Sequence, residues 1–198
     1  MATLAILVAE DEPLTAMALE AQIVALGHRI VGPARTGDEA VRLTREQPID
    51  VAIIDLGMSR RAGLDTAERI VRIRPVPVIV LAEYGESARS GREVGAPVFH
   101  HLVKPVSTEE LLPAISVARR RFEEWTELTT QVERLERELD ERKALERAKG
   151  LIMEERGVSA AQADRILAEE GERRGEGPGE IARMIIAANE LLRGTPSA

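Results

Sequence analysis

The first half of the chain alternates short hydrophobic runs with segments in which hydrophobic residues recur every three or four positions. The runs cover residues 4–8, 51–54, 77–81 and 98–103, with a weaker one at 29–31. Runs of this length favour strands buried on both faces, as in parallel sheets. The segments 14–26, 38–45 and 64–72 favour amphipathic helices. This alternation predicts a doubly wound α/β domain around a parallel five-stranded sheet.

A long helix with a narrow hydrophobic stripe is predicted after Lys104. Ser107 and Glu110 have the spacing of a capping box, which predicts a helix start at Ser107, and Pro113 predicts a slight bend. The stripe has the a and d spacing of heptads, interrupted by Arg121, and consists of Ala118, Trp125, Leu128, Val132, Leu135 and Leu139. Because the flanking residues are mostly charged, we expect a coiled-coil homodimer. The alternative is a helix that folds back on its own domain.

The hydrophobic face broadens beyond Arg142, which predicts a different kind of packing. A second capping box, Ser159 with Gln162, predicts a helix that ends near Gly175, and a further helical stripe runs from 181 to 192. Three such helices can bury their stripes together as a small all-α bundle. We therefore expect an α/β domain at residues 1–120, a coiled-coil linker at 121–140 and a three-helix domain at 141–198.

The composition excludes several classes of function. The chain has no cysteine, which removes disulfides, thiolate metal sites and cysteine nucleophiles. A net charge of -7 gives no general attraction to nucleic acid or anionic lipid, and 2% aromatic residues argue against a base-stacking surface. The hydrophobic run at 4–9 is too short to span a membrane and lacks signal-peptide features. We expect a cytoplasmic protein with no membrane partner.

Charged residues follow three of the predicted strands. Glu10 and Asp11 end the first strand, Asp55 ends the third and Lys104 ends the last. The carboxyl ends of parallel strands meet at one edge of a sheet, where ligands gather. Three carboxylates there repel one another, and a hard divalent ion such as Mg²⁺ relieves that repulsion. With Lys104 as a point charge for an anion, the pattern predicts a carboxylate that accepts a phosphoryl group.

The same positions resemble a known family. Residues 9–13 (Ala-Glu-Asp-Glu-Pro), Asp55 with Gly63 eight residues later, and residues 103–105 (Val-Lys-Pro) resemble the receiver domain of two-component response regulators, over residues 3–120. The resemblance implies a regulator, not an enzyme, that receives its phosphoryl group from a sensor histidine kinase. It also implies that the Lys104–Pro105 peptide bond is cis.

The resemblance also assigns roles within the acidic cluster. Asp55 is expected to be the phosphoacceptor, and Lys104 is expected to contact the phosphoryl group. Glu10, Asp11 and Asp55 are expected to hold Mg²⁺ together with the backbone carbonyl of Gly57.

Several positions depart from the receiver pattern. Ala82 stands where the family has a Thr or Ser hydroxyl, and His101 stands where it has Tyr or Phe. Ser59 replaces a common proline, and residues 85–91 show little helical periodicity. Either a different rearrangement transmits phosphorylation, or the chemistry is retained while the usual switch is uncoupled; we favour the uncoupled switch. His101 could confer sensitivity to pH, but we expect it to be exposed to solvent.

The last segment resembles a second family. Residues 145–153 (Leu-Glu-Arg-Ala-Lys-Gly-Leu-Ile-Met), Gly157, Ser159 and Ala163 resemble the ANTAR domain, a three-helix RNA-binding module of antitermination regulators. The resemblance implies binding to tandem RNA hairpins in nascent transcripts, which prevents a terminator from forming. The candidate RNA-binding cations lie on one helical segment and are Arg142, Arg147, Lys149 and Arg156.

The charge balance supports RNA binding only in part. Residues 138–198 contain 10 Lys and Arg against 13 Asp and Glu, so their net charge is -3. Gly171 and Glu172 replace a common Ala-Met pair, which we expect to weaken phosphate contacts. An alternative is therefore a protein-interaction module whose RNA-binding output is vestigial. DNA binding ranks lower because there is no basic recognition helix, and a phosphatase ranks lower still because no general base accompanies the carboxylates.

Overall fold

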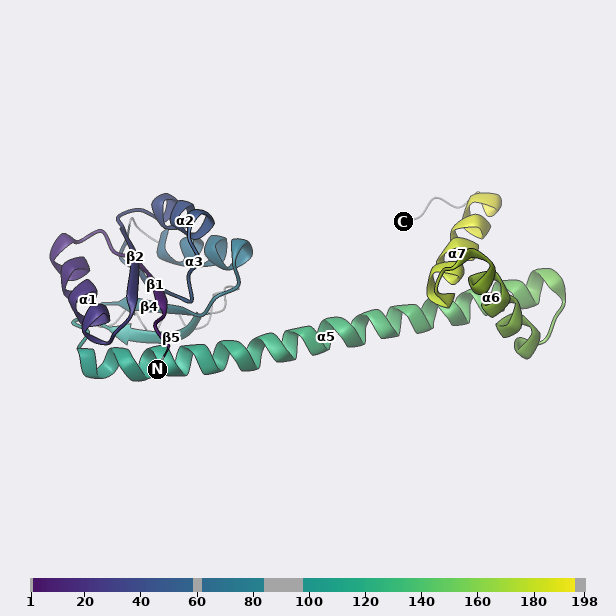
Figure 1. Cartoon of the computed structure of the whole chain (residues 1–198). Coiled ribbons are helices and arrows are strands. Elements are labelled where there is room, and N and C mark those ends of the chain that lie inside the picture. Colours follow the sequence, from purple (N-terminus) through teal and green to yellow (C-terminus); the bar gives the residue numbers. More distant parts are fainter. Residues whose placement is uncertain (1, 59–61, 84–97, 195–198) are drawn as a thin grey trace. The chain divides into compact units, whose positions relative to one another are not determined.

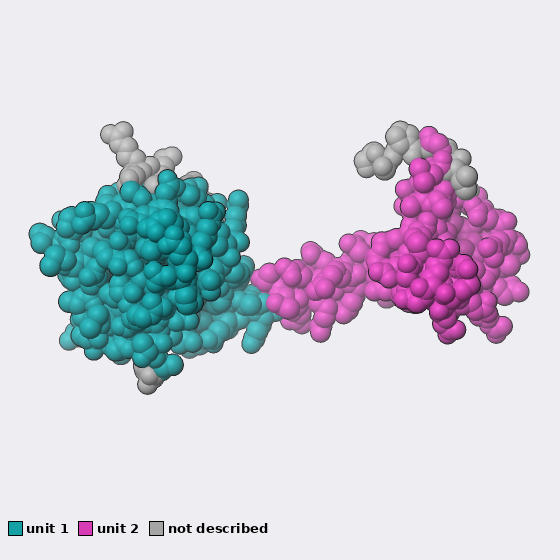
Figure 2. Space-filling view, turned by 45° about the horizontal axis from the view of Figure 1, so that its top comes forward, with its two compact units in different colours: residues 1–127 teal, residues 128–198 magenta. Residues whose placement is uncertain are grey.

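The computed structural model describes residues 2–58, 62–83 and 98–194 (Figure 1). They form two compact units, Met1–Glu127 and Leu128–Ala198 (Figure 2). The predicted domain limits at residues 120 and 140 stay a prediction. Ser59 and residues 85–91, which depart from the receiver pattern, lie outside the described residues.

Unit 1 contains a parallel sheet in the order β2-β1-β3-β4-β5. The strands are β1 (Ala5–Ala9), β2 (Arg29–Ala34), β3 (Val51–Asp55), β4 (Val78–Ala82) and β5 (Val98–Val103). Every residue of β1, β3 and β4 is buried, because helices cover both faces of the sheet. The predicted doubly wound five-stranded fold is therefore confirmed.

Among the described residues, two helices pack on each face of this sheet (Figure 1). On one face, α2 (Gly37–Glu46) and α3 (Ala62–Ile73) pack against alternate strand residues such as Leu7 and Ile54. On the other face, α1 (Pro13–Ala25) and the beginning of α5 (Thr108–Arg156) pack against residues such as Ile6 and Ile53. This alternation follows from the strand geometry, in which successive side chains point to opposite faces.

The helix α5 contributes to both units as one continuous element of 49 residues. The predicted capping box is present at its start: the Glu110 backbone N–H donates to Ser107 Oγ at 3.3 Å, and the Ser107 N–H donates to Glu110 Oε2 at 3.0 Å. The helix continues through Pro113. In unit 2, its residues Leu128, Val132, Leu135 and Leu139 are 51% to 62% exposed, so the described part of the chain does not cover this heptad stripe.

Unit 2 ends in a small helical bundle, as the sequence predicts. The last turns of α5 pack with α6 (Ala160–Arg174) and α7 (Pro178–Arg193) around a core of Ala148, Ile152, Ala163, Leu167, Ile181 and Ala182. The second capping box begins α6, and Gly175 ends it in the left-handed conformation. No helix in the described ranges is long and hydrophobic enough to cross a membrane.

Candidate functional site

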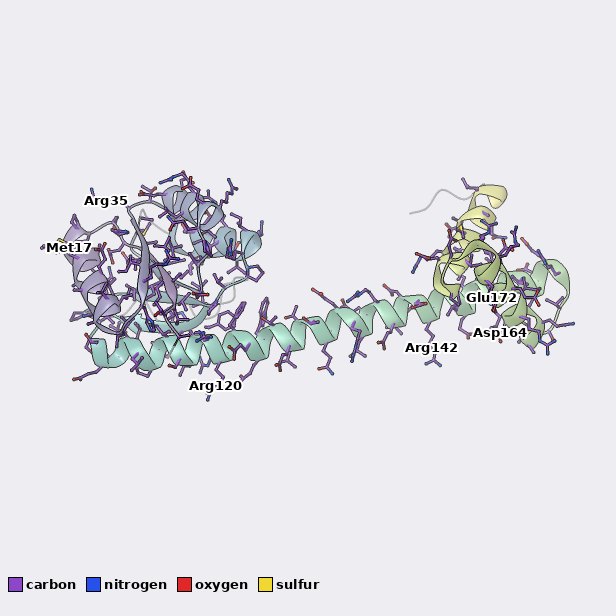
Figure 3. The ribbon with its side chains drawn as sticks, viewed as in Figure 1. Met17, Arg35, Arg120, Arg142, Asp164 and Glu172 are labelled. Carbon is purple, nitrogen blue, oxygen red and sulfur yellow. The ribbon has the colours of Figure 1, made fainter. Side chains whose placement is uncertain are left out.

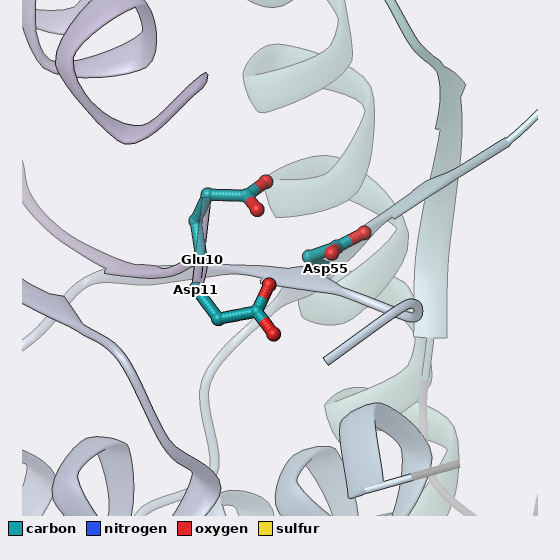
Figure 4. A group of neighbouring side chains, drawn as sticks. All are labelled: Glu10, Asp11 and Asp55. Carbon is teal, nitrogen blue, oxygen red and sulfur yellow. The ribbon is translucent and has the colours of Figure 1, made fainter. Parts of the chain in front are cut away.

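The ends of β1 and β3 bring three carboxylates together (Figure 4). The two strands are paired in parallel with Ala9 opposite Ile54, so Glu10, Asp11 and Asp55 emerge at the same edge of the sheet. One carboxylate oxygen from each residue lies within 4.8 Å of the others. Glu10 and Asp55 are buried, whereas Asp11 is exposed. The structure thus brings together the three acidic residues that the sequence singled out.

Lys104 completes this cluster from the end of β5. Its Nζ lies 2.8 Å from Glu10 Oε2 and 3.0 Å from Asp55 Oδ1. Its backbone N–H donates to the Ala82 carbonyl oxygen at 3.0 Å, which fixes the lysine beside β4. Burial by itself would lower the pKa of Lys104, but the two carboxylates outweigh burial and raise that pKa. The ammonium group is therefore held in its charged form. The peptide bond between Lys104 and Pro105 is cis, as the resemblance implies.

Burial in this cluster disfavours the charged form of Glu10. Burial raises the pKa of its carboxyl group, although the contacts with Lys104 and with the Glu12 backbone lower it. Its Oε1 accepts a hydrogen bond from the Glu12 N–H at 3.1 Å. Its Oε2 is buried, and the Lys104 ammonium group lies 2.8 Å from it. A buried carboxylate beside two more carboxylates suits a hard divalent cation.

Two glycines shape the backbone around Asp55. A Cβ atom on Gly57 would lie 3.1 Å from Asp55 Oδ2, so the chain passes close to the carboxylate there. A Cβ atom on Gly63 would lie 2.6 Å from the Asp55 carbonyl oxygen, so only glycine allows the beginning of α3 to pack against the end of β3. The role of the Gly57 carbonyl in metal binding remains a prediction.

The two switch positions lie on neighbouring strands. Ala82 is fully buried at the end of β4. His101 on β5 is half-buried, and its Nε2 is buried without a hydrogen-bond partner in the described part of the chain. Burial, and then the proximity of His100, lowers the pKa of His101. The expectation of a solvent-exposed histidine is therefore wrong, because the side chain of His101 is partly covered within the sheet edge.

The four candidate RNA-binding cations fall into two groups. Lys149 Nζ lies 2.8 Å from Asp164 Oδ1, and Arg147 donates to Glu190 Oε1 at 2.8 Å, so these two cations tie α5 to α6 and α7. Asp164 and Arg142 are labelled in Figure 3. Arg142 and Arg156 are exposed and form no ion pair with any described residue. This second pair is electrostatically available to an anionic ligand.

The acidic stretch of α6 is partly neutralised. Glu170 contacts both Arg173 and Arg174, and these contacts lower the pKa of Glu170 to about 2. Glu172 is exposed at the surface of α6 (Figure 3). Gly171 is buried, and a Cβ atom there would lie 2.9 Å from the Glu176 carbonyl oxygen, so the turn after α6 requires the small residue.

Two features of the surface escaped the sequence analysis. The first is a groove of about 590 Å³ in unit 2, with Ile152, Ile166 and Ile185 inside it and Arg156 and Asn189 among its lining residues. Its residues come from α5, α6 and α7, so no local sequence motif marks it.

The second feature is an exposed hydrophobic face on α1. Leu14, Met17 and Val24 are largely exposed there, and Met17 is labelled in Figure 3. Leu14 also lines a hollow of about 410 Å³ that reaches Lys104 and Pro105. The helical spacing of these residues is typical of a stripe that faces the core, so the sequence did not indicate that they are exposed.

Comparison with known proteins defines the class of protein. Residues 6–116 match the response regulator receiver domain, and residues 133–186 match the ANTAR domain. The chain belongs to the response regulators that combine a receiver domain with an ANTAR output domain, a family of antiterminator-type regulators and not of enzymes.

Particular relatives sharpen this assignment. The transcriptional regulatory protein PdtaR of Mycobacterium tuberculosis (strain ATCC 25618 / H37Rv) is 39% identical over 158 residues, which are 80% of this chain and 77% of that protein. A receiver domain from Clostridium thermocellum superimposes with a TM-score of 0.54 at 29% identity, over 60% of this chain and 95% of that one. The receiver domain of Erythrobacter litoralis PhyR gives a TM-score of 0.53 at 30% identity, over 60% of this chain and 91% of that one.

Proposed function

We propose that this chain is an RNA-binding antiterminator of a two-component system that is phosphorylated on Asp55. A sensor histidine kinase supplies a phosphoryl group to Asp55, and unit 2 binds tandem RNA hairpins in nascent transcripts and prevents terminator formation. The observation that carries the signalling half is the buried cluster of Glu10, Asp55 and Lys104, with Asp11 at its open side. The match of residues 133–186 to the ANTAR domain supports the RNA-binding half.

The residues of the cluster have distinct roles in phosphoryl transfer. An oxygen of Asp55 attacks the phosphorus atom, and the bond between phosphorus and the donor breaks. Lys104, already 3.0 Å from Asp55 Oδ1, compensates the negative charge of the transferred group. Glu10, Asp11, Asp55 and the Gly57 carbonyl would hold Mg²⁺, which when bound neutralises the phosphoryl oxygens.

The exposed face of α1 fits the need for a kinase partner. A donor of phosphoryl groups must reach Asp55 from the edge of the sheet where Lys104 and Pro105 lie. The hollow lined by Leu14, Lys104 and Pro105 borders both that edge and α1. Exposed Leu14, Met17 and Val24 offer a hydrophobic contact area for such a partner.

The RNA-binding role uses the two cations that form no ion pair with a described residue. Arg142 and Arg156 on α5 are available for phosphate contacts. Arg147 and Lys149 hold the bundle together, and they contribute to binding chiefly by placing α5 against the other helices. Two bundles in one homodimer would engage two hairpins at once, which strengthens binding without any new contact.

The homodimer forms through the exposed heptad stripe of α5. Val132 at an a position with Leu128 and Leu135 at d positions is the combination that favours two parallel strands. In that arrangement Glu138, at a g position, faces Lys143 of the partner subunit at an e position, which is an attractive pair. Residues of opposite charge thus support a second copy as the partner of this stripe.

The switch is atypical because Ala82 has no hydroxyl group to reach a phosphoryl oxygen, and His101 replaces the usual aromatic residue. The second candidate function, a protein-interaction module with a vestigial RNA output, is favoured by the exposed acidic residues of α6.

Crosslinking of the full-length chain to cellular transcripts, followed by sequencing, decides between the two functions. The antiterminator retains transcripts in which paired hairpins precede a terminator. Recovery of a protein without any RNA would overturn the proposal in favour of the interaction module.

A further inference from the structure

Three of the four Phe, Trp and Tyr residues of this chain meet where β5 packs against α5. Phe99 on β5 and Phe122 on α5 meet edge to face, with ring centroids 5.4 Å apart. Trp125, the only tryptophan of the chain, lies 6.0 Å from Phe99 and 6.1 Å from Phe122. Edge-to-face pairs of this kind are favourable beyond the area they bury. In a protein with 2% aromatic residues, this cluster makes a specific connection between β5 and α5.

The same strand leads directly to the phosphoacceptor pocket. Phe99 lies near the beginning of β5, and Lys104 follows its end. Arg121 on α5 also donates to the Phe99 carbonyl oxygen at 3.1 Å, which adds a polar link to the ring contacts. Lys104 already contacts Glu10 and Asp55, so a phosphoryl group on Asp55 that redirects the lysine acts on a strand whose other end holds α5.

Trp125 occupies a position shared by two faces of α5. Successive residues of an α-helix are about 100° apart. By this spacing, the residues that pack on the sheet lie about a quarter of a turn from the heptad stripe, and Trp125 lies between the two faces. The sheet-packed residues are Leu111, Ala114, Ile115, Ala118 and Phe122. Trp125 is 39% exposed, so its contact with Phe99 covers only part of the indole.

We infer that Trp125 is the regulated first layer of the homodimer interface. Without phosphorylation, Phe99 and Phe122 hold the indole against β5, and the interface begins at Leu128. Phosphorylation of Asp55 draws Lys104 and β5 away from this contact, and the indole joins the interface with a second copy of the chain. The inference rests on the proposed function. It describes how phosphorylation of Asp55 reaches the dimer interface without a hydroxyl group at residue 82. It favours the interpretation in which a different rearrangement transmits phosphorylation over the uncoupled switch.

Fluorescence of the single tryptophan tests this inference in the full-length protein. The emission spectrum, quenching by acrylamide and the dimer dissociation constant are measured with Mg²⁺, before and after addition of beryllium fluoride. We expect the emission to shift to shorter wavelength, quenching to fall, and the dissociation constant to fall about tenfold. Asp55→Ala should abolish all three responses.

Two matched variants of α5 distinguish a contact that responds to phosphorylation from one that stabilises the dimer equally in both states. Leu128→Ala removes an interface residue that does not belong to the aromatic cluster, so it should weaken the dimer in both states and keep the tenfold ratio of the two dissociation constants. Trp125→Ala should bring that ratio close to one. Phe99→Leu should tighten the dimer in the absence of beryllium fluoride, because it releases the indole.

The outcomes distinguish this inference from the proposed function. If acetyl phosphate phosphorylates Asp55 but the emission and the dissociation constant do not change, the inference is overturned and the proposed function stands. If Trp125→Ala keeps the tenfold ratio of the two dimer dissociation constants, the inference is also overturned. If Asp55 accepts no phosphoryl group and beryllium fluoride has no effect, both are overturned.

Discussion

Two lysines of this protein lie at the same distance from a carboxylate, in very different surroundings. Lys104 Nζ is 2.8 Å from Glu10 Oε2 in unit 1, and Lys149 Nζ is 2.8 Å from Asp164 Oδ1 in unit 2. The Glu10 side chain has no solvent exposure, whereas that of Asp164 is 55% exposed. Water therefore screens the second pair and not the first. Burial, and not distance, decides what an ion pair does here.

The difference has a functional meaning. In the buried pair, the desolvated carboxylate lies beside two further acids, which prepares a site for a cation and a phosphoryl group. In the exposed pair, both charges are satisfied and the contact fastens two helices. In the receiver domain, the same buried charges thus affect both stability and phosphoryl transfer. In the ANTAR bundle, the exposed ion pair affects stability only.

Removal of each lysine should produce the largest contrast. Lys104→Met leaves Glu10 and Asp55 buried without their cation, so we expect the free energy of unfolding to fall by about 3–5 kcal/mol. Urea unfolding at neutral pH without divalent ions measures the loss. Lys149→Met is the matched control and should cause a much smaller loss, because its partners remain hydrated. Equal losses would mean that burial is not the deciding factor.

Two glycine replacements repeat the contrast within unit 2. Gly171→Ala places a methyl group 2.9 Å from the Glu176 carbonyl oxygen, so we expect a loss of about 1–3 kcal/mol. Gly150 is exposed within α5 with no atom near its missing Cβ, so Gly150→Ala should gain about 1 kcal/mol. Thermal unfolding of the two variants should move in opposite directions. A loss of RNA affinity in the stabilised Gly150→Ala would place the RNA close to this helix.

The pH dependence of stability should single out Glu10. Because its pKa is raised in the folded state, the folded protein binds more protons than the unfolded chain just above the ordinary pKa of a glutamate. The contribution of Glu10 to stability is therefore present at lower pH and is lost as pH rises through the raised pKa. Glu10→Gln removes this term, so its stability relative to the wild type should improve as pH rises. Urea unfolding without divalent ions measures this difference, and a difference independent of pH would contradict the assignment.

The smallest predicted effect concerns RNA binding and its dependence on salt. Arg156→Gln removes an unpaired cation, so it should reduce the slope of log affinity against log salt by about one. Arg147→Gln removes a cation already paired with Glu190, so it should leave the slope nearly unchanged. Titration with the hairpin RNA recovered by crosslinking measures both slopes. Equal slopes for the two variants would remove the distinction between paired and unpaired cations.

The receiver pocket was predictable because rigid strands determine it. Glu10, Asp55 and Lys104 follow parallel strands, whose carboxyl ends meet at one edge whatever the loops do. The burial of His101 was not predictable, since it depends on what packs across the edge of the sheet.

Other features depended on contacts between distant segments. Lys149 and Arg147 were grouped with the RNA-binding residues because their partners, Asp164 and Glu190, come from other helices. Trp125 fitted the heptad pattern, but its contact with Phe99 joins residues far apart in the sequence. The spacing of residues along one helix cannot reveal either kind of contact.

Phosphorylation of the full-length chain by acetyl phosphate tests the central claim most directly. With Mg²⁺, intact-mass spectrometry should show one added phosphoryl group on the wild type, and peptide mapping should place it on Asp55. A chelator, Asp55→Asn and Lys104→Met should each suppress the modification strongly. Absence of the modification in the wild type, or equal modification of Asp55→Asn, would contradict the account.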